Sequence, residues 1–157
     1  NSERGMATSH LNLADLLFSN NKTDSAEFHA NACYQIFTKS NNQKGLTTVL
    51  SIIGRILNAH HDFKGAIDKC LQGRNIAKDL GSQEDLKNNC LCLSQAYEKT
   101  GNTSKALEYY KEYNAARDTL KDEEKAKEIA RKELNFEFKA QTQRDSILHQ
   151  EETKSKP

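Results

Sequence analysis

The sequence predicts an all-α protein made of three consecutive helical hairpins followed by one long C-terminal helix. Three observations support this prediction: small and apolar residues recur with a period of 40, turn-forming residues separate the expected helices, and no strand pattern competes before residue 130. The clearest hairpin is the segment 93–113, LSQAYEKTGNTSKALEYYKEY, in which a tight turn at 100–103 joins two helices. One hairpin of this size cannot bury its apolar face alone, so it needs neighbours of the same kind.

Copies of this hairpin align without a gap when the chain is shifted by 40 residues. Ala26, Ala66 and Ala106 share one column that only alanine fills, so we expect them to be buried where the two helices of each hairpin cross closely. The other shared columns are Leu13/Ile53/Leu93, Leu16/Ile56/Ala96, Leu17/Leu57/Tyr97, Ala30/Cys70/Tyr110, Cys33/Gly73/Tyr113 and, at the turn, Asn21/His61/Gly101.

The elements are expected in the following order along the chain. Residues 1–6 show no pattern and are expected to be loose. Helices are expected at about 7–19 and 24–39, at about 43–59 and 63–80, and on both sides of the turn at 100–103. Asp62 is expected to cap the helix that Gly81 ends, Ser82 to cap the next helix, and Thr103 or Asn102 to cap the last one.

These hairpins resemble the tetratricopeptide repeat (TPR) family over about residues 7–120, in its longer variant with roughly 40 residues per unit. The residues that carry the resemblance are Leu93, Tyr97, Gly101, Ala106 and Tyr110 in the third copy, Gly54 and Ala66 in the second, and Ala14 and Ala26 in the first. The family's Trp and closing Pro are absent, and the only proline is Pro157. The resemblance implies a TPR-like right-handed superhelix whose function is to bind a protein or peptide.

In this family the first helix of each repeat lines a concave groove. Matched position by position, the groove of this chain is expected to carry Asn12, Asp15, Thr48, Ser51, Arg55, Asn58, Asn88, Gln95 and Glu98. Amides and hydroxyls suit an extended peptide, whose backbone needs donors and acceptors. Arg55 is the only cation in this set, so we expect it to contact an acidic or carboxylate-bearing peptide.

Two alternatives concern this groove. Some family members grip a C-terminal carboxylate with several basic residues and Asn, but the corresponding positions here hold Leu11, Asp15, Ile52 and Cys92, which argues against that mode. The groove could instead be solvated, or filled by the chain's own tail.

The segment 121–157 is predicted to form a long charged helix, with a short strand at 134–138 as the alternative. Its apolar residues form two stripes on nearly opposite faces, Ile129, Phe136, Ala140 and Ile147 on one and Leu134, Phe138 and Leu148 on the other. Two opposed stripes need two partners. We expect the second helix of the third hairpin to cover one stripe and a second copy of the chain to cover the other, giving a homodimer; the alternative is that both stripes are covered within one chain.

The tail also resembles the segment that follows such repeats in bacterial sensor histidine kinases and related membrane-tethered signalling proteins. That resemblance implies that the chain is the sensory or scaffolding region of a larger signalling protein. A self-assembly module without a peptide ligand is the alternative, and an enzyme whose catalytic part lies outside these residues is a weaker one.

The composition limits the partners. The formal net charge of +1 argues against a nucleic-acid footprint, and no apolar run approaches the roughly 18 residues that span a bilayer. Because the chain starts at Asn1, we interpret it as a soluble fragment of a longer protein, either cytoplasmic or the extracytoplasmic part of a membrane-tethered protein.

No pattern points to catalysis, a metal or a cofactor. The sequence has no phosphate-binding glycine loop and no nucleophile elbow, so we expect a protein that is not an enzyme. The cluster His60-His61-Asp62 lies in an expected turn, where polar residues are common. The four cysteines are Cys33, Cys70, Cys90 and Cys92. They are expected to be free, because three of them align with helix-interior columns and the chain can build a core without disulfides.

Overall fold

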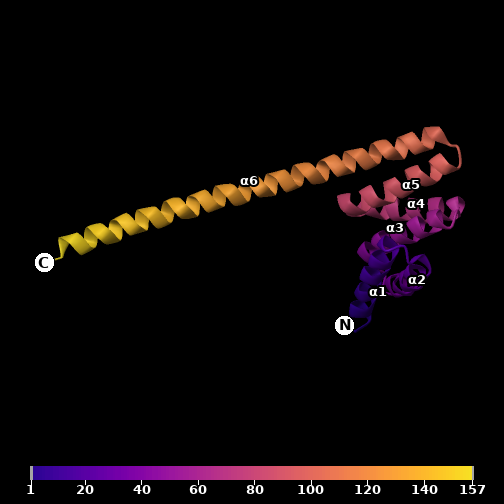
Figure 1. Ribbon diagram of the computed structural model, residues 1–157, viewed down its shortest axis with the longest axis horizontal. Coiled ribbons are helices and arrows are strands. Elements are labelled where there is room, and N and C mark those ends of the chain that lie inside the picture. Colours follow the sequence, from indigo (N-terminus) through magenta and orange to yellow (C-terminus); the bar gives the residue numbers. More distant parts are fainter. Residues whose placement is uncertain (1, 157) are drawn as a thin grey trace. The chain divides into compact units, whose positions relative to one another are not determined.

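The computed structural model describes residues 2–156, and these residues are helical apart from short turns (Figure 1). The helices are α1 (Ser2–Ser19), α2 (Thr23–Lys39), α3 (Gln43–Ala59), α4 (Phe63–Leu80), α5 (Gln83–Lys99) and α6 (Thr103–Ser155). No strand occurs in the described residues, so the predicted all-α fold class is confirmed and residues 134–138 are helical.

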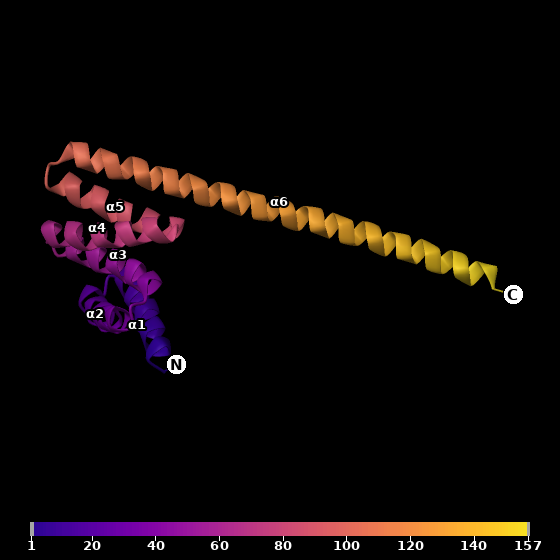
Figure 2. The same ribbon diagram turned by 180° about the vertical axis from the view of Figure 1, so that it is seen from behind.

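The helices pair as hairpins that repeat with the period seen in the sequence. The second helices of the three hairpins begin at Thr23, Phe63 and Thr103, which are 40 residues apart. Within the unit that extends to Thr119, α1 packs on α2 and α3 packs on α4. Each hairpin also packs on the one before it, since α3 contacts α2 and α5 contacts both α3 and α4 (Figure 2).

The turn column explains why each hairpin reverses at the same place. Asn21, His61 and Gly101 all have positive φ angles, of 61°, 61° and 81°. The backbone N–H of the next residue then bonds to a carbonyl five residues earlier, which ends the first helix. Asp62 accepts a hydrogen bond from the backbone N–H of Gly65 at 3.0 Å, which confirms it as a cap.

Other ends of helices agree with the expectations only in part. Gly81 ends α4 in the left-handed conformation, as predicted. Of the two candidates for the α6 cap, Asn102 accepts a hydrogen bond from the backbone N–H of Lys105 at 3.2 Å. The expectation for Ser82 was wrong: it stands at the N-cap of α5 without a side-chain cap bond, because its hydroxyl donates to Asp85 instead.

The core lies between the helices of neighbouring hairpins. Ala26, Ala66 and Ala106 are buried, as the alanine column predicted. One apolar cluster gathers around α1, α2 and α3, and a second around α4, α5 and the first turns of α6. In the second cluster the rings of Tyr97 and Tyr109 stack in parallel with centroids 5.7 Å apart.

The chain begins its first helix earlier than predicted. Residues 2–6 were expected to be loose, but they form the first turns of α1; Asn1 lies outside the described residues. Glu3 stands in the first turn, where a negative charge interacts favourably with the helix dipole. The absence of an apolar pattern there reflects exposure and not the absence of a helix, because residues 2–6 are all exposed.

The long C-terminal helix is not a separate element. The helix α6 runs without interruption through Leu120, so the tail continues the second helix of the third hairpin. We had expected the second helix of the third hairpin to cover one apolar stripe of the tail. It cannot do so, because the tail is the continuation of that same helix. From Leu120 onward the residues form a second unit, and every described residue after Leu120 in it is exposed.

Candidate functional site

A cavity of about 420 Å³ opens on the side formed by the first helices of the hairpins. Phe18 contributes from α1 and Arg55 from α3, and α5 supplies the rest of the lining, Asn88, Leu91, Cys92 and Gln95. Three of the predicted groove residues, Arg55, Asn88 and Gln95, thus line one cavity. The lining combines a cation, two amides and apolar surface, a mixture that is typical of ligand-binding clefts.

Arg55 is held at this cavity by two weak contacts. Its Nη1 lies 3.3 Å from Oδ1 of Asp15, and its guanidinium lies 4.7 Å from the centre of the Phe18 ring. The side chains of Arg55 and Asp15 are 35% and 60% exposed, so water screens this ion pair. The guanidinium therefore keeps N–H donors available for a carboxylate that enters the cavity.

Asn58 joins α3 to α5 beside the cavity. Its Nδ2 donates to the backbone carbonyl of Cys92 at 3.3 Å. Its Oδ1 is buried and accepts no hydrogen bond from the described residues. A buried amide oxygen without a partner costs free energy, because it has lost its contacts with water.

The other predicted groove residues are less suited to a ligand. Ser51 is buried, and its hydroxyl donates to the carbonyl of Thr48 at 2.7 Å. The hydroxyl of Thr48 donates to Asp85 at 2.8 Å. Asn12 and Glu98 are exposed and lie outside the lining of the cavity. The predicted groove set also omits three lining residues, Phe18, Leu91 and Cys92, because it was chosen for polar side chains alone.

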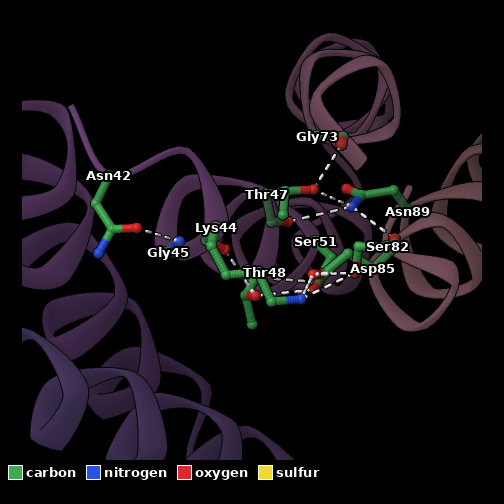
Figure 3. Close-up of polar contacts among 10 residues, drawn as sticks. All are labelled: Asn42, Lys44, Gly45, Thr47, Thr48, Ser51, Gly73, Ser82, Asp85 and Asn89. Atoms are coloured by element: carbon green, nitrogen blue, oxygen red, sulfur yellow. Dashed lines mark hydrogen bonds and ion pairs between the residues drawn. The ribbon is translucent and has the colours of Figure 1, made fainter. Parts of the chain in front are cut away.

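The polar contacts of Thr48 belong to a network that locks α5 onto α3 (Figure 3). The buried carboxylate of Asp85 accepts hydrogen bonds from Lys44, Thr48 and Ser82. One turn later, the buried amide of Asn89 donates to the backbone carbonyl of Thr47 at 3.1 Å (Figure 3). A buried charge without partners would be costly, so this network fixes the register between two hairpins.

One of the thiol expectations was wrong. Cys70 and Cys92 form a disulfide between α4 and α5, with Cα atoms 6.3 Å apart, whereas Cys33 and Cys90 are free and buried. The pair escaped the sequence argument because the two residues lie in different columns of the repeat. Gly54 makes room for it: a Cβ at that position would overlap Sγ of Cys70 and lie 2.7 Å from Sγ of Cys92. This glycine was the signal that could have revealed the close approach of three helices.

The two free thiols are inert in their surroundings. Burial raises the pKa of Cys33 to about 11 and that of Cys90 to about 12. Thiolates are the reactive form, so neither group is prepared to act as a nucleophile at neutral pH.

Three of the histidines have close polar neighbours. His60 lies with Asp24 and Glu27, and the three side chains offer ligand atoms within 4.8 Å of one another on the surface. His10 and His29 face each other with their Nδ1 atoms 2.8 Å apart. Exposed carboxylates beside one histidine, or a hydrogen-bonded histidine pair, are explained without an ion.

The chain matches no protein-family model, and no curated protein matches it significantly. Within residues 2–156, no helix combines the length and the apolar character that crossing a membrane requires. The case for a function therefore rests on the cavity, its charges and the hairpins that build it.

Proposed function

We propose that the hairpin unit is a non-catalytic, TPR-like module that binds an extended peptide in the groove formed by α1, α3 and α5. The observation that carries this proposal is Arg55. It is a partly exposed cation at the edge of a cavity with amide and apolar lining, and among residues 2–156 its side chain is held by an exposed carboxylate and an aromatic ring.

The lining indicates the chemistry of the ligand. Arg55 favours an acidic side chain or a terminal carboxylate, which a guanidinium can bind through two parallel hydrogen bonds. Asn88 and Gln95 offer both donors and acceptors to the backbone of an extended peptide. Phe18 and Leu91 provide apolar surface for a neighbouring side chain.

A displayed library of random peptides, selected on the full chain, tests the proposal. Recovered peptides should be enriched in Asp and Glu, and calorimetry should show that Arg55→Ala weakens their binding by roughly 1.5–3 kcal/mol, the range for hydrogen bonds to charged groups. Arg131→Ala is the matched control, because it removes the same charge from an exposed position of the tail. Peptides whose affinity ignores both Arg55 and Asn58 would refute a groove site.

A second candidate function is self-assembly through the tail. Large apolar side chains of the second unit are more than half exposed, namely Ile129, Leu134, Phe136, Phe138, Ile147 and Leu148. A second copy of the chain is the partner we propose for them, together with the smaller Ala140 on the same stripe as Phe136. This arrangement suits the sensory or scaffolding region of a larger signalling protein, in which a helix couples binding to a dimeric output.

Light scattering on the full chain tests the second candidate. We expect a dimer at micromolar concentration that Phe136→Glu dissociates, while Leu80→Glu, at an exposed apolar position of α4, leaves it intact. A monomer at high micromolar concentration would contradict the dimer.

A further inference from the structure

One stripe of α1 is exposed although its equivalents in α3 and α5 are buried. The stripe runs along one face at helical spacing and holds Gly5, Ser9, Asn12, Leu13 and Leu16. Leu13 is 42% and Leu16 is 59% exposed. The residues 40 positions later, Ile53 and Ile56, are 9% and 2% exposed.

In the second hairpin, the equivalent stripe belongs to α3 and is covered by α2 of the preceding hairpin. The aromatic ring of Phe37 sits against Gly45, where a Cβ would overlap it. Farther along the same two helices, Ala30, Ile53 and Ile56 belong to one buried apolar cluster. The covering helix thus presents a small residue to the apolar end of the stripe and a large ring to its glycine.

In the third hairpin, α4 covers the equivalent stripe of α5. Gly73 lies so close to Asn89 that a Cβ would overlap the amide, and Thr47 donates to the Gly73 carbonyl at 2.6 Å (Figure 3). The stripe of α5 includes the buried polar residues Asp85 and Asn89. Polar members such as Ser9 and Asn12 therefore do not prevent the stripe of α1 from being covered.

We propose that the open stripe of α1 is a docking surface for the second helix of a further hairpin of the same 40-residue class. Two features of α1 match the covered α3. Gly5 corresponds to Gly45 and has nothing within 4 Å of a Cβ built on it, so a large aromatic ring can pack against its backbone. Leu13 and Leu16 offer the apolar end that a small residue covers.

The occupant is a helix of the α2 kind and not α6 of a second copy. In α2 and α4 the column facing the next hairpin holds Ala30 and Cys70, which are small and fully buried. In α6 the same column holds Tyr110. Leu107 lies about one helical turn before it, and both side chains are about half exposed. A tyrosine would overpack the crossing that the small residues allow.

The test extends the full chain with its own first hairpin. A second copy of residues 3–42 is inserted before Glu3, so that the copied α2 meets α1 through the same connection that leads from α2 to α3. Hydrogen exchange measures the protection of backbone amides 9–16. We expect this protection to rise about tenfold or more in the extended chain, as it does where tertiary packing covers a helix.

A matched pair of substitutions assigns the effect to the stripe. Leu16→Glu should abolish the added protection in the extended chain and leave the stability of the original chain nearly unchanged, whereas Leu80→Glu, at an exposed position of α4, should preserve the added protection. Unchanged exchange of amides 9–16 on extension would overturn the proposal.

Two further outcomes are decided by the original chain. If light scattering shows a dimer that Leu16→Glu dissociates, a second copy is the occupant and the proposed hairpin is wrong. If the extended chain does not fold, a synthetic peptide of residues 20–42 added to the original chain replaces it. Methyl resonances of Leu13 and Leu16 should then shift on titration with the peptide, and their invariance would refute the proposal. None of these outcomes depends on the groove or on Arg55.

Discussion

Replacing Gly54 by alanine should destabilise the hairpin unit, although alanine is normally the better helix residue. In an exposed helix interior, the change from Gly to Ala stabilises by roughly 0.5–1 kcal/mol. At Gly54 the added Cβ would overlap Sγ of Cys70 and lie 2.7 Å from Sγ of Cys92. Both sulfurs are tied to each other and to two helices, so they cannot move apart to make room.

The steric term should therefore exceed the helix-propensity term. Overpacking of a tight core costs about 1–3 kcal/mol, and two simultaneous overlaps with constrained atoms place Gly54→Ala at the upper end. A net loss of about 2 kcal/mol would lower the melting temperature by roughly 4–8 °C for a chain of this size.

Circular dichroism melts without reductant provide the measurement, and Gly5→Ala provides the control. Gly5 also lies within a helix, but nothing stands within 4 Å of its built Cβ, so this variant should gain the roughly 0.5–1 kcal/mol of helix propensity. The reasoning is refuted if Gly54→Ala melts at or above the temperature of Gly5→Ala.

Three further predictions use the same structure. Denatured, unreduced protein should expose two alkylatable thiols by intact mass and reduced protein four, whereas four without reductant would disprove the Cys70–Cys92 bond. Ala66→Leu should cost about 1–3 kcal/mol in thermal melts through overpacking of a fully buried crossing, and an unchanged melting temperature would mean that the packing there is loose. Burial raises the pKa of Cys33 to about 11 and that of Cys90 to about 12, so the contribution of these thiols to stability is complete below about pH 9 and is lost as pH rises toward those values. In urea unfolding at a series of pH values, Cys90→Ala should therefore reduce the fall of the midpoint concentration above about pH 9, and an identical pH profile would contradict this prediction.

The sequence could predict the hairpins because their determinants are local. The turn column works through positive φ angles at Asn21, His61 and Gly101, and the alanine column works through size, so both can be recognised in a single chain. The same period also predicted where the second helices begin. It failed at Ser2–Met6, where an exposed helix carries no apolar pattern to recognise.

The contacts between hairpins could not be predicted in the same way. Cys70 and Cys92 occupy different columns, and their approach depends on the crossing of α4, α5 and α3 at Gly54. The sequence predicted a groove position for Arg55 but not its contact with Phe18, because that contact forms only when α1 and α3 pack together. Side-chain chemistry was visible in the sequence, whereas the pairing of side chains required the packed helices.

The change of composition at Leu120 coincides with the boundary between the two compact units, but it does not coincide with a helix boundary. The sequence becomes highly charged there, and we interpreted the change as the start of a new helix. The helix in fact continues, since neither Gly nor Pro interrupts residues 103–155, and what changes is that its described residues beyond Leu120 are exposed. Composition thus marks the end of burial and not the end of a helix.

That distinction bears on the role of the tail. Within the second unit, the ion pair between Lys132 and Glu128 is a surface i,i+4 pair, whose contribution is only about 0.3–0.5 kcal/mol. Phe136 and Phe138 are 69% and 70% exposed, and they lie on opposite faces of one helix. Because one continuous helix cannot fold upon itself to cover them, the intramolecular arrangement considered at the outset would require a break in α6. A partner that binds both faces would keep the helix intact, and this is the physical reason for the self-assembly that we propose.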